Sequence, residues 1–120
     1  MRLARFLILG GAAGVLPGCY SPPPPDIHSQ DAVQLIPAIK IAVQRHDQSA
    51  VPFLVEDLSS TDSAVRLYAI DGLRRLTGED FGYRAYDTEA ARRPAVLRWE
   101  GWLAARNKTV SEHARQSGNI

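Results

Sequence analysis

The side chains with the most reactive chemistry belong to one cysteine, Cys19, and three histidines, His28, His46 and His113. The histidines lie on three separate segments, and none has a neighbour at the spacing of metal ligands. A single cysteine leaves no partner for an internal disulfide. No serine lies in a Gly-x-Ser-x-Gly motif, the turn that exposes the nucleophile of many hydrolases. We therefore predict no catalytic residue, no metal or cofactor site, and a protein that is not an enzyme.

Cys19 ends an N-terminal segment with the layout of an export signal. Arg2 and Arg5 precede an apolar run over residues 6–15, and small residues follow it. The run is shorter than the roughly 20 apolar residues that a membrane-spanning helix needs. The sequence Leu-Pro-Gly-Cys at residues 16–19 resembles the lipobox of bacterial lipoproteins.

The lipobox resemblance implies that residues 1–18 are a cleaved signal peptide and that Cys19 carries the lipid. Diacylglycerol would be attached to the thiol, and the new amino group could be acylated. The implied partner of the anchor is a bacterial membrane, the outer one where a cell has two, because Tyr20 and not an aspartate follows Cys19. Pro17 departs from the family pattern, in which a smaller or hydroxylated residue is commoner. The alternative is an ordinary signal peptide with an incidental cysteine.

Residues 19–29 are predicted to be a spacer. They contain four consecutive prolines, Pro22–Pro25, which favour an extended polyproline II conformation. Such a segment would hold the following domain about 10–15 Å from the bilayer. Proline runs are also ligands of proline-reading domains, which is the alternative role.

Residues 30–106 are predicted to form one small all-α domain with about four helices. The apolar positions repeat with helical spacing, and no stretch alternates as a strand would. Asp62 is expected to cap the third helix and Gly78 to end it, while Asp87 or Thr88 caps the last helix.

Two prolines interrupt this pattern. Pro37 and Pro94 are expected either to kink their helices or to mark fresh starts, because proline lacks the N–H that a helix interior uses. The polar residues 107–120 are predicted to be a disordered tail.

The second and third predicted helices resemble one HEAT repeat. Residues 51–58, a turn with Asp62, and a helix opening with Val65 and Arg66 carry the resemblance, together with the spaced Ala69 and Leu73. The resemblance implies a short α-solenoid of helical hairpins, with residues 31–45 as part of a degenerate preceding repeat and the last helix as a partial third unit. Arg66 would reach an acidic group or a turn carbonyl of the neighbouring unit, with Asp57 and Asp62 as candidates.

The function expected from this resemblance is protein–protein interaction: an anchored scaffold or adaptor that binds another envelope protein. A formal net charge of +1 without a basic stripe argues against nucleic acid as a partner. The alternative is a structural or cell-wall-polymer-binding protein, in which an aromatic surface makes the contact. That surface would comprise Phe81, Tyr83 and Tyr86 in loop 81–86, with Trp99 and Trp102. Against it, Phe81 and Tyr83 could fold under the last helix, and the tryptophans could close the end of the stack.

Overall fold

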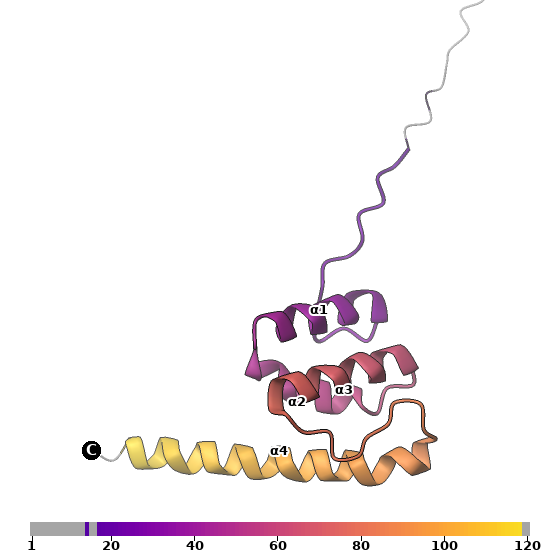
Figure 1. The fold of residues 1–120 in the computed structure, drawn as a ribbon. Coiled ribbons are helices and arrows are strands. Elements are labelled where there is room, and N and C mark those ends of the chain that lie inside the picture. Colours follow the sequence, from indigo (N-terminus) through magenta and orange to yellow (C-terminus); the bar gives the residue numbers. More distant parts are fainter. Residues whose placement is uncertain (1–13, 15–16, 119–120) are drawn as a thin grey trace, which may run out of the picture.

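The computed structural model describes residue 14 and residues 17–118, and this part of the chain is all-helical, without a strand (Figure 1). Four α-helices follow one another: α1 (Ala32–Gln44), α2 (Val51–Asp57), α3 (Ser63–Thr77) and α4 (Glu89–Ser117). A 3₁₀ turn, η1 (Gln48–Ala50), leads into α2. The all-α prediction with about four helices is confirmed. None of the helices in the described part is long and apolar enough to cross a membrane.

The helices begin at polar caps. The side chains of Asp31, Asp62 and Thr88 accept hydrogen bonds from backbone N–H groups in the first turns of α1, α3 and α4. Each cap satisfies one of the donors that a helix start leaves free. Gly78 ends α3 with φ of 81°, a left-handed conformation that glycine adopts without steric cost. The predicted caps at Asp62 and Gly78 are confirmed, and Thr88 rather than Asp87 caps α4.

The two internal prolines do not start new helices. Pro37 lies inside α1 and Pro94 inside α4, and each helix begins several residues earlier. A proline in the interior removes one helical hydrogen bond. The side chains packed beneath both helices offset that loss, so the expectation of a fresh start at these residues is wrong.

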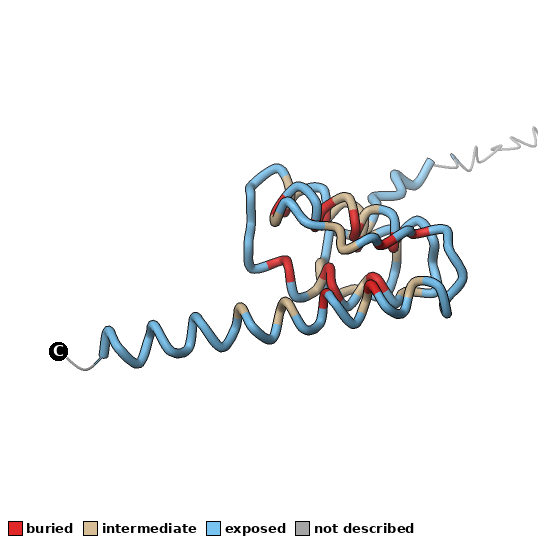
Figure 2. Tube along the Cα trace, turned by 60° about the horizontal axis from the view of Figure 1, so that its bottom comes forward, coloured by how far each residue is buried: buried red, intermediate tan, exposed pale blue. Residues whose placement is uncertain are grey.

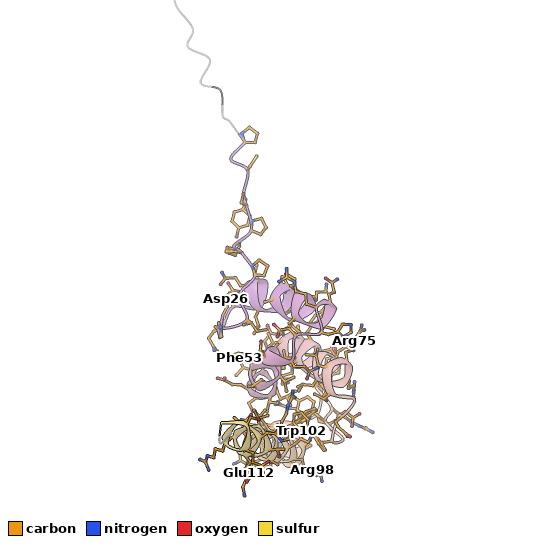
Figure 3. The ribbon with its side chains drawn as sticks, turned by 90° about the vertical axis from the view of Figure 1, so that its left-hand side faces the viewer. Asp26, Phe53, Arg75, Arg98, Trp102 and Glu112 are labelled. Atoms are coloured by element: carbon orange, nitrogen blue, oxygen red, sulfur yellow. The ribbon has the colours of Figure 1, made fainter. Side chains whose placement is uncertain are left out.

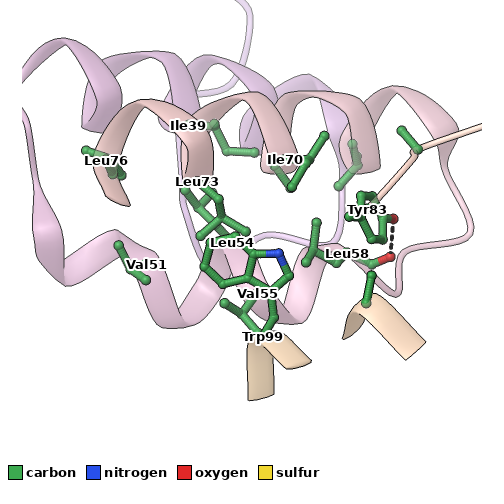
Figure 4. Close-up of a cluster of buried hydrophobic side chains, with 14 of the residues drawn as sticks. Ile39, Val51, Leu54, Val55, Leu58, Ile70, Leu73, Leu76, Tyr83 and Trp99 are labelled. Carbon is green, nitrogen blue, oxygen red and sulfur yellow. Dashed lines mark hydrogen bonds between the residues drawn. The ribbon is translucent and has the colours of Figure 1, made fainter. Parts of the chain in front are cut away.

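The helices form a layered stack. α1 and α2 both pack against α3, and α4 packs against α2, so that α1 and α4 lie at opposite ends (Figure 1). Gly72 lies where the layers approach most closely, because a Cβ there would stand 3.0 Å from a methyl group of Leu54. One core runs through the stack (Figure 4). Its buried members are Leu35, Ile39, Val51, Leu54, Val55, Leu58, Val65, Ala69, Ile70, Leu73, Leu76, Tyr83, Ala85, Ala95 and Trp99.

Only the first half of α4 belongs to this core. The helix has 29 residues, and its buried residues are Ala95 and Trp99 (Figure 2). Residues 107–117 are exposed but remain helical, so the prediction of a disordered tail is wrong for them. Extending a helix whose first turns are already fixed by packing costs little, whereas starting one in isolation is unfavourable. The prediction for residues 119–120 lies outside the described residues.

The folded domain begins before α1. The backbone N–H of Asp26 donates to the carbonyl of Gln34 at 3.1 Å, and Ile27 packs against the core. Residues 17–25 extend away from the helices without regular secondary structure (Figure 1). The spacer therefore ends at Pro25, and the predicted boundary at residue 29 is wrong because residues 26–29 fold back onto α1 and α2.

Candidate binding groove

The loop between α3 and α4 is fixed to the core by Tyr83. Its side chain is 1% exposed, and its hydroxyl donates a 2.6 Å hydrogen bond to the carbonyl of Leu58 at the end of α2 (Figure 4). Arg92 donates to the same carbonyl at 3.2 Å. This carbonyl lies at a helix end, where no backbone N–H of the helix can donate to it. The side chains of Tyr83 and Arg92 supply the missing donors.

Phe81, Trp99 and Trp102 form a row of edge-to-face aromatic pairs. The ring centroids of Phe81 and Trp99 are 4.8 Å apart, and those of Trp99 and Trp102 are 5.4 Å apart. Trp99 is fully buried, and its indole N–H donates to the carbonyl of Asp80 at 3.2 Å. The guanidinium of Arg106 lies over the half-buried ring of Trp102 at 5.3 Å. The row joins α4 to the loop and to α2.

The five aromatic residues do not form the binding surface that the alternative prediction required. Tyr83 and Trp99 are buried, Phe81 and Trp102 are half-buried, and Tyr86 alone is exposed, at 74%. A sugar ring cannot stack on an aromatic face that already packs in the core. The prediction of an aromatic contact surface is therefore wrong for Tyr83 and Trp99, for which the competing prediction of a core role is confirmed, and it stays a prediction for the exposed Tyr86.

The residues of the HEAT-like signature have structural roles. Val65, Ala69 and Leu73 are buried, and Asp62 caps α3. Arg66, 8% exposed, is the one buried charged residue in the described part of the chain.

The guanidinium of Arg66 contacts carbonyl groups and no carboxylate. It donates to Ser60 at 2.8 Å and Thr61 at 3.0 Å in the preceding turn, and to Ala85 at 3.0 Å in the loop. Carbonyl partners are confirmed, although those of Ser60 and Thr61 belong to the turn within the same predicted repeat and not to the neighbouring unit, and the candidate partners Asp57 and Asp62 are wrong. A planar fork with several donors suits three carbonyls that converge on one point.

Cys19 and the histidines stay apart. Cys19 is a free, exposed cysteine before the folded domain, and His46 and His113 are exposed on separate elements. Within residue 14 and residues 17–118, no group of three or more histidine, cysteine, aspartate or glutamate side chains could hold a metal ion.

A groove of about 400 Å³ runs along one side of the stack, between α1, the junction before it and the start of α2. We call it the α1–α2 groove. Its apolar lining comprises Pro25, Ile27, Ala38, Ile41, Ala42, Ala50 and Phe53, and its polar lining comprises His28, Arg45, Asp47 and Ser49. The rings of His28 and Phe53 meet edge to face at 4.5 Å, which holds the junction against α2. Figure 3 labels Phe53 and Asp26 on this side of the molecule.

Two opposite charges stand at one end of the α1–α2 groove. The Ser49 hydroxyl and backbone N–H both donate to Asp47, and with nearby Arg45 they lower the pKa of that carboxyl below its ordinary value. Arg45 makes no ion pair within the part of the chain that the structure describes. An apolar floor with a few polar groups at the rim is the usual make-up of a binding site.

Asp57 lies under the same junction, in a second small pocket that Ile27, His28 and Phe53 also line. Its Oδ2 atom is buried and has no hydrogen-bond partner. Burial, with a smaller contribution from the adjacent carboxylate of Glu56, raises the pKa of Asp57 from 3.8 to about 6. A carboxylate without a donor is costly to bury in its charged form, so the site favours the protonated acid.

The sequence predictions did not name the α1–α2 groove, and they named Asp57 only as a possible partner of Arg66. The groove joins residues 25–28 to residues 38–53, and only the fold-back of the junction brings them together. The sequence of α1 did contain an indication of a second surface, because this helix has more apolar residues than its buried face needs. Searches of family models, curated proteins and solved structures returned no match to this chain.

Proposed function

We propose that this chain is an envelope lipoprotein whose helical domain binds another protein through the α1–α2 groove. The groove carries the proposal, since it combines an apolar floor with two charges at one end. Its volume of about 400 Å³ is in the range of sites that take several side chains of a partner. Arg45, without an ion pair in the described residues, provides a contact for a carboxylate of that partner.

The arrangement of the helices supports an interaction module of the HEAT kind. In this proposal α2 and α3 form one repeat, α1 belongs to a preceding unit and α4 to a following one. Units of this type bury one face against the next and leave an extended surface for partners. Binding of a wall polymer is not proposed, because Tyr83 and Trp99 pack in the core.

The anchor in this proposal is lipid on Cys19, and residues 19–25 are the tether. The exposed position of Cys19 ahead of the folded domain supports it, because a modifying enzyme needs the thiol free of the core. Intact-mass measurement of the membrane-bound protein tests it. We expect the mass of diacylglycerol and acyl groups on the chain that begins at Cys19, and no such mass for Cys19→Ala. Recovery of the unmodified chain from the membrane would exclude the anchor.

Partner binding is tested by placing a photo-activated crosslinking residue at Ala38, inside the α1–α2 groove, and at Ala104, on the exposed side of α4. We expect a crosslinked product of one defined mass from Ala38 in intact cells, and none from Ala104. The product should weaken with Arg45→Glu, which reverses the charge at the rim. Equal crosslinking from both positions, or an Ala38 product that Arg45→Glu does not change, would refute a binding role for the groove.

A further inference from the structure

The outer face of α1 includes an apolar surface around Val33 that the helical stack leaves uncovered. Val33, Pro37, Lys40 and Gln44 follow one another at helical spacing on the side opposite the core-facing Leu35 and Ile39. The exposed Lys40 lies at the edge of this face, where its ammonium is 5.5 Å from the centre of the Tyr68 ring of α3. Val33 is 56% exposed although its side chain is wholly apolar. The half-buried Ile36 and Ile41 border this face on its two sides.

Charge along α1 is uneven and restricts what can cover this face. The helix itself, AVQLIPAIKIAVQ, contains no acidic residue, and Lys40 is its one charged side chain. Arg45 and His46 follow its C-terminal end. At the other end, the Asp31 carboxylate is occupied as the N-cap of the helix. An apolar strip with basic groups at one end is complementary to a surface that is apolar inside and anionic outside.

The position of the tether, residues 19–25, is a second and independent indication of what covers this face. Residues 17–25 leave the domain from the end at which α1 lies, and α4 lies at the far end, in two views at right angles (Figures 1 and 3). α1 is therefore the helix nearest to any anchor at Cys19. The seven residues from Cys19 to Pro25 span roughly 20 Å when extended, so α1 can lie no farther than about this distance from the anchored surface and reaches it when the tether lies along the bilayer.

We propose that the outer face of α1 lies on the anionic surface of the bilayer to which the chain is tethered. This inference rests on the proposed anchor at Cys19 for its cellular setting, though not for its test. One valine with its flanking isoleucines and one lysine is too small a patch to recruit a free protein. A short tether lowers the affinity that is needed, because it raises the effective concentration of the patch at the bilayer, where weak contacts can then be occupied.

The test attaches the full-length chain to vesicles through the Cys19 thiol, using a maleimide-bearing lipid that supplies the anchor whether or not cells lipidate this residue. A genetically encoded fluorescent amino acid replaces Val33 in one variant and Leu97 in the other. These two residues are 56% and 55% exposed and lie on helices at opposite ends of the stack, so they form a matched pair. The vesicles contain phosphatidylethanolamine with or without phosphatidylglycerol, and a quencher is placed on the acyl chains.

We expect several-fold stronger quenching at position 33 than at position 97, more with phosphatidylglycerol than without it, and a reduction by Lys40→Glu or by high salt. Equal quenching at the two positions would overturn the proposal. Quenching that neither Lys40→Glu nor high salt reduces would also overturn it. A blue shift at position 33 without vesicles that grows with protein concentration would overturn it in favour of a second copy of the chain. Failure of cellular lipidation would appear only in the mass of Cys19, so the two proposals can fail separately.

Discussion

The two ends of the helical stack differ in what covers the core. At the α4 end, a loop anchored by Phe81 and Tyr83 and a long polar helix cover the core, and Trp99 is fully buried. At the α1 end, a short helix that is apolar on most of its surface is the last layer, and Val33 remains 56% exposed. A stack of helical units needs a polar outer face at each free end to stay soluble. The outer surface of α4 is mostly polar, although Leu97 and Val110 are 55% and 63% exposed, and the surface of α1 around Val33 is where we propose the contacts.

The largest effect should come from the closed end. Trp99→Ala removes a fully buried indole and its hydrogen bond to Asp80, so we expect the free energy of unfolding to fall by about 3–5 kcal/mol. Trp102→Ala, at the half-buried neighbour, should lower it by only about 1–2 kcal/mol. Urea denaturation followed by far-ultraviolet circular dichroism measures both. Equal losses of unfolding free energy in the two variants would mean that burial of Trp99 does not dominate the stability of this end.

Arg66 offers a second test of the closed end, because it ties the loop to the turn before α3. Arg66→Ala leaves three carbonyls without their donor, and we expect a loss of about 2–3 kcal/mol. Arg66→Lys should recover little of it, since the single ammonium group of lysine cannot reach both the turn and the loop as the separate Nε and Nη1 donors of arginine do. The exposed Arg84 is the control, and its replacement by alanine should change stability by less than about 0.5 kcal/mol. Full rescue by lysine would show that charge, and not the fork of donors, matters here.

Asp57 connects stability to pH at the junction beside α1. Its pKa in the folded chain, about 6, lies above the ordinary value of 3.8, so the fold prefers the protonated acid. The resulting stabilisation is complete below about pH 4 and is lost as the pH rises through about 6. Asp57→Asn, which stays neutral, should therefore raise the unfolding free energy near pH 8 by about 1–2 kcal/mol, a value already reduced for the half-exposed site.

The pH profile provides the control for Asp57→Asn within one pair of proteins. The advantage of the variant over the wild type should shrink towards zero below about pH 4, where both side chains are neutral. Thermal unfolding across this range measures it. An advantage that is independent of pH would attribute the effect to packing and not to ionisation.

The smallest effect should come from the open end. Val33→Gln exchanges an exposed apolar side chain for a polar one, and we expect a change in unfolding free energy of less than about 0.5 kcal/mol. Ile39→Ala, on the core face of the same helix, should cost about 2–5 kcal/mol. A large loss on Val33→Gln would mean that the outer face of α1 already has a partner within the protein, and that the two ends do not differ.

The sequence predicted the helices because their signals are local. Helical spacing of apolar residues, the cap at Asp62 and the stop at Gly78 each act within a few residues of their own position. The buried Tyr83 and Trp99 were anticipated as one of two options, since an aromatic residue after a helix end suits a core as well as a surface. Periodicity alone could not decide between them.

The parts that the sequence did not predict depend on contacts between distant segments. The fold-back of residues 26–29 brings His28 onto Phe53 and creates both the α1–α2 groove and the pocket at Asp57. Arg66 was predicted to reach either an acidic group or a turn carbonyl, because charge pairing can be read from a sequence, whereas the convergence of carbonyls from residues 60, 61 and 85 cannot. The helical residues 107–117 were predicted as a tail because their composition is polar, although a helix fixed at one end needs no apolar face to continue.

The length of α4 has a consequence for the exchange of its backbone amides with solvent. The helix is continuous over 29 residues, yet side chains cover only its first half. Amides near Trp99 should exchange deuterium at the rate of global unfolding, whereas those of residues 107–117 should open by unwinding from the C-terminal end. A gradient of protection along α4 would then mark, residue by residue, where support by the core ends.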